Sequence, residues 1–157
     1  MNMTRMLKWW LFFCVQVVAY GLAWWYGVFN MMYAADFSKI SFGILFVHLL
    51  GTLWIGSLTR KAERGEPIDD STGWFVSEAL LTMGMIGTVI GFIHMMDTTL
   101  AFKAASIDAN ALKQALGGVA AGIGTSLWAT LTGLIGSLTV KTQMNNLERL
   151  LEEKQKQ

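Results

Sequence analysis

Few side chains in this sequence could handle a proton or a cation, and those that could lie within long apolar segments. Thr88 and Thr130 stand near the middle of two such segments, where a hydroxyl group either bonds to its own helix backbone or faces a polar path. Glu78 stands near one end of a segment, so its carboxylate either reaches the membrane surface or admits a proton or cation. His48 fits a packing role or a proton relay, and His94 fits a partner contact or a titrating role. These residues suggest ion transfer within a membrane.

Enzymatic and metal chemistry find no support in the sequence. No arrangement of serine, cysteine or carboxylate residues resembles a nucleophilic triad or an acid/base pair. Two histidines on different segments do not make a metal site. The single cysteine, Cys14, lies in an apolar run and has no partner for an intrachain disulfide. We therefore expect no catalytic residues, no metal and no cofactor apart from a translocated ion.

The composition indicates an integral membrane protein. Hydrophobic residues make up 54% of the chain and charged residues 15%, whereas a soluble domain averages about a quarter charged residues. The net charge of +1 argues against a nucleic-acid partner. A helix needs about 20 apolar residues to cross the hydrocarbon core. Four segments meet this length, so we predict an all-α membrane protein in which residues 1–157 form a single domain with spans at about 9–29, 40–58, 74–96 and 112–140.

Short polar segments should connect these spans. Residues 30–39 are expected to form a tight outer turn, and residues 59–73 a loop rich in helix-capping Asp and Ser. Residues 97–110 should form a second outer loop, in which Asp108 caps the fourth span. The polar tail 142–157 has a helical pattern of leucines, so it should extend the fourth span beyond the membrane.

Basic residues near the span ends predict the orientation of the chain, because they are enriched on the cytoplasmic side. An N-in/C-in arrangement places nine of the twelve basic residues inside and three outside. The predicted location is therefore a bacterial inner (cytoplasmic) membrane, crossed several times. The inner set is Arg5, Lys8, Arg60, Lys61, Arg64, Lys141, Arg149, Lys154 and Lys156, and the outer set is Lys39, Lys103 and Lys113.

The last two spans differ from the first two in being rich in small and hydroxyl residues. Such residues at four-residue spacing let helix backbones approach closely, and hydroxyl groups on the same ridge should face a partner helix or a polar path. The pattern therefore predicts association of these helices, either as tight packing or as the lining of a central pore. The small residues are Gly84, Gly87 and Gly91 in the third span and Gly118, Gly122, Ser126 and Gly133 in the fourth.

Two stretches resemble the MotA/TolQ/ExbB proton channel family. The stretch MGMIGTVIGFIHMM at 83–96 is similar to that family's "GLxGTVxGI" helix. The stretch GVAAGIGTSLWATLTGLIGSL at 118–138 is similar to its last helix, "GIxxALxxTxxGL". The two matches are gapless and occur in the order of the family, and the resemblance as a whole, which extends over the third and fourth spans, covers about half of the chain. Because each is short, it is their combination that makes the resemblance specific.

The resemblance implies a mechanism and partners. Members form pentamers around a dimer of a second protein of the MotB, TolR or ExbD type, whose single membrane helix carries an aspartate. Protons pass along the interface and drive rotation that does mechanical work at a distance. The family's pore threonines fall on Thr88 and Thr130, with Ser126 and Glu78 as further candidates for the ion pathway. The chain would thus be a homopentameric stator-type motor subunit, with its third and fourth spans lining the centre.

Some features depart from the family pattern. Thr125 stands where the TolQ/ExbB branch usually has an acidic residue, and Thr139 stands where a proline is usual. With Thr132, the additional Thr125 leaves sodium open as the coupling ion. The large cytoplasmic domain is reduced to the loop 59–73, which argues against a flagellar role and for a minimal member of the family.

Three other functions compete with an ion-driven motor. A holin-like or other small oligomeric pore is also short and helical, but it does not need two threonines matched to a family motif. A small multidrug transporter needs a carboxylate in its first span, and residues 9–29 contain none. A structural membrane scaffold would be indifferent to alanine at Thr88 or Thr130.

Overall fold

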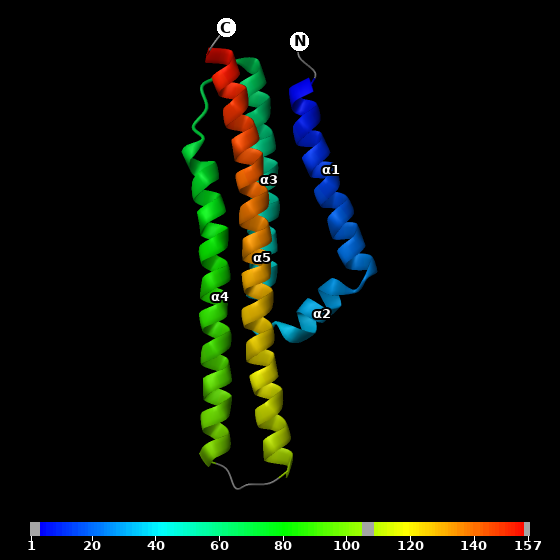
Figure 1. Cartoon of the computed structure of the whole chain (residues 1–157), viewed down its shortest axis with the longest axis vertical. Helices are drawn as coiled ribbons and strands as arrows, with labels where there is room; N and C mark the ends of the chain where they lie inside the picture. The colour runs from blue at the N-terminus through cyan, green and yellow to red at the C-terminus, as the bar shows by residue number, and fades with distance from the viewer. Residues whose placement is uncertain (1–3, 105–108, 156–157) are drawn as a thin grey trace.

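A computed structural model describes residues 4–104 and 109–155 of the chain. This part of the chain forms five α-helices joined by short connections. Helices α3, α4 and α5 run side by side, whereas α1 stands apart over most of its length (Figure 1). The start of α1, the α3–α4 connection and the end of α5 lie at the same end of the molecule (Figure 1). The helices are α1 (Thr4–Trp25), α2 (Val28–Ala35), α3 (Ile40–Arg64), α4 (Ser71–Ala104) and α5 (Ala109–Gln155).

The length and surface of these helices define a multi-pass membrane protein. Helices α3, α4 and α5 are each long and apolar enough to span a bilayer, and α1 with α2 adds a fourth candidate span that is bent by 70°. Large apolar side chains cover the outside of the bundle, including Trp25 at 85% exposure and Leu138 at 68%. A soluble protein rarely exposes so extensive an apolar surface. The prediction of an all-helical membrane protein is confirmed, with three or four candidate spans.

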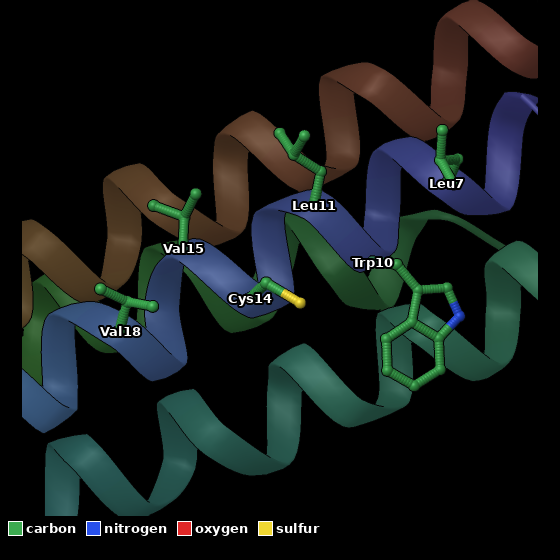
Figure 2. A pocket seen from close by; sticks show the side chains of 6 residues that line it. All are labelled: Leu7, Trp10, Leu11, Cys14, Val15 and Val18. Atoms are coloured by element: carbon green, nitrogen blue, oxygen red, sulfur yellow. The ribbon is translucent and has the colours of Figure 1, made fainter.

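The outer surface of α1 illustrates this apolar character. Figure 2 shows an open pocket that six side chains of this one helix line, and Cys14 among them is exposed. The six recur at helical spacing, so they share one face of α1. In a bilayer, a face of this kind contacts lipid. The six residues are Leu7, Trp10, Leu11, Cys14, Val15 and Val18.

The first outer connection differs from the prediction. Residues 30–39 were expected to form a turn, but Val28–Ala35 is helix α2, and only 36–39 separate it from α3. Gly27, at φ 70°, breaks the first span by adopting the left-handed conformation that glycine accepts without steric cost. The prediction was wrong here because the apolar residues after Gly27 resume a helix in a new direction.

Asp36 organises the short connection between α2 and α3. Its side chain is fully buried. Its Oδ1 accepts hydrogen bonds from the Lys39 backbone N–H at 3.0 Å and the Ser38 hydroxyl at 3.1 Å, and its Oδ2 accepts one from the Ser41 N–H at 2.9 Å. These bonds satisfy backbone N–H groups that have no partner within the first turn of α3. The carboxylate also lies at the positive end of the helix dipole, where a carboxylate stabilises a helix.

The α3–α4 connection is shorter than expected. Residues 59–73 were predicted as a loop, but α3 continues to Arg64 and α4 begins at Ser71. Gly65, at φ 76°, ends α3 with N–H bonds to the Ala62 and Lys61 carbonyls. The Asp69 carboxylate accepts hydrogen bonds from the hydroxyl and the backbone N–H of Ser71, at 2.6 and 3.0 Å. These bonds lower the pKa of Asp69 from its ordinary value.

Most of the predicted second outer loop and the polar tail are continuations of α4 and α5. Helix α4 runs to Ala104, so most of the predicted loop 97–110 is helical, and Asp108 lies outside the described residues. Helix α5 continues to Gln155, which confirms the helical tail. Both helices continue past the α2–α3 connection (Figure 1). That connection therefore lies level with the middle of α4 and α5 (Figure 1).

The core lies between α3, α4 and α5. Leu80 of α4 and Ala129 of α5 are fully buried, and Ile44 of α3 packs with them. At the end near the C-terminus, Leu147 of the tail is buried, and the Trp74 indole N–H donates a 2.6 Å hydrogen bond to Glu148 Oε1. The tail is thus packed against the bundle, and this end of α5 holds α4 in place.

Candidate ion pathway

Three hydroxyl groups lie together where α4 meets α5. Thr88 of α4 and Thr130 of α5 have their Oγ1 atoms 2.5 Å apart, and both residues are half-buried. Ser126 lies one turn before Thr130 on α5, and its hydroxyl donates to the Thr88 carbonyl at 3.0 Å. We call Thr88, Ser126 and Thr130 the hydroxyl cluster. The four-residue spacing of Ser126 and Thr130 puts both on the face of α5 that contacts α4.

The hydroxyl cluster has more acceptors than protons. The Thr130 hydroxyl is 2.8 Å from the Ser126 carbonyl, the Thr88 hydroxyl is 3.1 Å from the Gly84 carbonyl, and the Ser126 hydroxyl is also 3.0 Å from the Gly122 carbonyl. If Thr130 donates to its own helix, its oxygen accepts the proton of Thr88. Each proton therefore has a choice of acceptors without movement of heavy atoms. Such an arrangement can relay a proton or offer oxygen atoms to a cation.

Glycine makes the close contact of α4 with α5 possible. A methyl group placed on Gly91 would lie 2.5 Å from the Gly122 carbonyl oxygen, and one on Gly122 would lie 2.6 Å from the Gly91 carbonyl. One on Gly84 would be 3.1 Å from the Ala129 carbonyl. The distances at Gly91 and Gly122 are too short for a side chain, and the one at Gly84 would require the neighbouring backbone to shift. The small residues of both helices thus bring the hydroxyl groups within hydrogen-bonding distance.

The other predicted glycines also lie at helix contacts. Gly87 faces Ala129 and the start of α3, Gly118 faces Thr98, and Gly133 faces the backbone of α4 at Leu80. All six predicted glycines therefore pack against a helix of the same chain. Their alternative role, as the lining of a central pore, stays a prediction.

Glu78 is not part of the hydroxyl cluster. It lies ten residues before Thr88 on α4, which corresponds to about 15 Å along the helix axis. Glu78 is exposed, and its backbone carbonyl accepts a hydrogen bond from Thr82. The structure therefore does not bring this predicted ion-pathway residue together with the threonines.

Two further threonines of α5 face away from the hydroxyl cluster. Thr125 is buried, and its hydroxyl accepts a 2.7 Å hydrogen bond from the backbone N–H of Phe37, which attaches the α2–α3 connection to α5. The Thr132 hydroxyl donates to the Trp128 carbonyl of its own helix. The Thr125 hydroxyl therefore holds the α2–α3 connection against α5 and is not part of the hydroxyl cluster.

The two histidines have separate environments. His94 of α4 stacks on the ring of Phe37, with ring centroids 4.1 Å apart. His48 of α3 is buried, and its Nδ1 is 2.6 Å from the Tyr20 hydroxyl of α1. Sequence reasoning did not single out Tyr20 or Asp36, because a tyrosine in an apolar run and an aspartate in a turn carry no distinctive signal. Within residues 4–104 and 109–155, no group of three His, Cys, Asp or Glu side chains could hold a metal ion.

Long apolar helices that share a partly buried group of hydroxyl side chains are typical of membrane channels and transporters. The model of the MotA/TolQ/ExbB proton channel family matches residues 76–157, just over half of the chain. The chain belongs to this family, which confirms the resemblance seen in the sequence. The matched region contains the entire hydroxyl cluster. Searches of curated proteins and of solved structures gave no match.

Proposed function

We propose that this chain is the channel subunit of an ion-driven motor in the bacterial inner membrane. It would couple the flow of protons, or of sodium ions, to mechanical work. The observation that carries this proposal is the contact of Thr88 with Thr130, because it joins two spans within the region that matches the family. Polar hydroxyl groups inside a membrane are costly unless they are used or bonded, and this pair retains lone pairs for a passing ion.

The proposal requires a second protein that supplies a carboxylate. In the described residues, no acidic side chain bonds to the hydroxyl cluster, and Glu78 lies away from it. Hydroxyl groups can relay a proton but do not hold one as a carboxylate does. A dimer of a single-span protein with an aspartate in its membrane helix would place that group beside Thr88 and Thr130.

Five copies of the chain would surround that dimer. The apolar outer faces of α4 and α5, with residues such as Val89 and Leu127 exposed, are suited to contacts with neighbouring copies and with lipid. The chain would cross the membrane with its N- and C-termini in the cytoplasm. The common end of the two termini and of the α3–α4 connection is compatible with this orientation (Figure 1).

Native mass spectrometry provides the first test. The chain should be purified alone and after co-expression with the product of the neighbouring gene. We expect a pentamer, or five copies together with two copies of a single-span protein. A dimer, or a broad ladder of large oligomers, would contradict the proposal and favour a transporter or a lesion-forming pore.

A further inference from the structure

A separate cavity of about 390 Å³ lies between α1, α2, α3 and α5. Most of its lining is apolar, with side chains such as Phe12, Met32 and Leu131. Its polar lining residues include Gln16, Tyr20, His48 and Thr132. Because Thr132 lies two residues after Thr130 on α5, the cavity and the hydroxyl cluster occupy different faces of that helix.

Two polar groups at this cavity are buried without a hydrogen-bond partner. His48 is 3% exposed, and its Nε2 has no partner within the structure. The Nε2 of Gln16 is likewise buried and without a partner. Gln16 and Tyr20 are four residues apart on α1, so both face the cavity. An unsatisfied polar group in the membrane interior costs free energy, and a ligand that forms a hydrogen bond with either nitrogen would remove this cost.

The hydrogen-bond chemistry indicates what the ligand must offer. The Tyr20 hydroxyl and His48 Nδ1 share a hydrogen bond of 2.6 Å, whose direction depends on which nitrogen of His48 carries the proton. When Tyr20 donates, neutral His48 carries its proton on Nε2. The amide Nε2 of Gln16 is a donor with either tautomer, and His48 Nε2 is a second donor when Tyr20 donates to Nδ1, so an acceptor oxygen satisfies these groups.

We infer that this cavity binds a bilayer-soluble amphiphile with an apolar body and a carbonyl oxygen. Water alone fits poorly, because a water molecule occupies about 30 Å³ and needs several polar partners, whereas this cavity is large and mainly apolar. Its volume falls in the usual range of small-molecule sites, and its few polar groups would orient the ligand. A fatty acid, a lipid ester and an isoprenoid quinone all supply the required chemistry.

Photolabelling of the full chain in phosphatidylcholine nanodiscs tests this inference. The probes are a diazirine-bearing palmitic acid and a diazirine-bearing hexadecane of the same length, with cross-links mapped by mass spectrometry. The acid should label residues that line the cavity. Excess unlabelled palmitic acid, lysophosphatidylcholine or a short-chain ubiquinone, added separately, should identify which source of the carbonyl competes best.

Matched variants separate binding from general damage. Ala19→Phe would fill the cavity from α1, whereas Val17→Phe adds the same ring to an exposed position that does not line it. We expect labelling to fall at least about tenfold in the first variant only. His48→Leu removes one donor, so it should weaken the acid about five- to tenfold and leave the hydrocarbon probe unchanged.

Three results would overturn the inference. The first is an absence of acid labelling in the cavity, as expected if water fills it. The second is equal labelling of Ala19→Phe and Val17→Phe. The third is cross-links from Ala19→Cys to another copy of the chain, because a neighbouring copy would then occupy the cavity. Size-exclusion chromatography of each variant verifies that it is folded, and none of these outcomes depends on the motor function.

Discussion

At the scale of single residues, the proposed ion pathway depends on how the hydroxyl groups of α4 and α5 are arranged. Thr88 and Thr130 each bond to their own helix, as threonines in membrane helices commonly do. They also contact each other across the α4–α5 interface, and Ser126 bonds to the Thr88 carbonyl. The second set of bonds links proton positions on two helices, which the proposed ion pathway requires.

The functional importance of this pair can be measured as ion flux. In proteoliposomes that contain the chain and its partner, Thr88→Ala and Thr130→Ala should each reduce proton or sodium flux about 10- to 100-fold, because one hydrogen bond to a charged species is lost. Thr88→Ser should retain much of the flux. A pH-sensitive or sodium-sensitive dye inside the vesicles provides the readout.

Thr82→Ala is the matched control for these variants. Thr82 lies on the same helix and bonds to the Glu78 carbonyl, but it is exposed and has no contact with the hydroxyl cluster. Its flux should equal that of the unmodified chain. Normal flux in both Thr88→Ala and Thr130→Ala would instead favour a structural scaffold.

At the scale of the helices, small residues decide how closely α4 and α5 approach. The carbonyls of Gly91 and Gly122 lie where any side chain on the opposite glycine would clash. In lipid there is little hydrophobic force between helices, so this close packing supplies much of their attraction. The contact also sets the separation of Thr88 and Thr130, which links stability to the geometry of the candidate pathway.

Alanine at Gly91 should destabilise the protein. The added methyl group would force α4 and α5 apart, and we expect the free energy of unfolding to fall by about 1–3 kcal/mol. In contrast, Gly117 has no atom within 4 Å of an added methyl group, so Gly117→Ala should raise stability by up to about 1 kcal/mol through helix propensity. Denaturant unfolding in detergent compares the two variants. A loss at Gly117 as large as that at Gly91 would argue against the clash.

At the scale of the whole molecule, one end of the bundle differs from the other. The start of α1, the α3–α4 connection and the end of α5 gather at one end, and the end of α4 and the start of α5 lie at the opposite end (Figure 1). Lys61 and Arg64 end α3 at the first of these ends, and Lys113 follows the α4–α5 connection at the second. The excess of basic residues at the first end predicts that it faces the cytoplasm.

Cysteine labelling can determine this orientation. In a Cys14→Ser background, a membrane-impermeant maleimide added from outside should label Lys113→Cys and leave Glu66→Cys unmodified until the membrane is opened. Both positions are exposed in the structure, so a difference in their labelling by the maleimide reports the side of the membrane on which each lies. Labelling of Glu66→Cys alone would reverse the predicted orientation.

Comparison of the predicted and observed helices shows where pattern reasoning is strong. The predicted segments 40–58, 74–96 and 112–140 each lie within one long helix, because a long apolar run is a strong signal, whereas the segment 9–29 is broken at Gly27. Apolar length placed the connections at 30–39, 59–73 and 97–110 incorrectly. Once a helix has formed, each further residue adds a backbone hydrogen bond, so the helix can extend into polar sequence beyond the apolar run. Helices α1 and α3 end next to Gly27 and Gly65, whose left-handed conformations stop these two helices locally.

The candidate site shows the same division between sequence and tertiary structure. Sequence alone determined that the protein is helical and membrane-embedded, and it identified Thr88, Thr130 and their surrounding glycines, because composition and spacing act along one chain. Only the tertiary structure decided that these two hydroxyl groups meet, that Glu78 lies away from them and that His48 pairs with Tyr20 beside a cavity. The physical reason is that such contacts depend on the rotation and separation of whole helices, which are set by packing between segments far apart in the sequence.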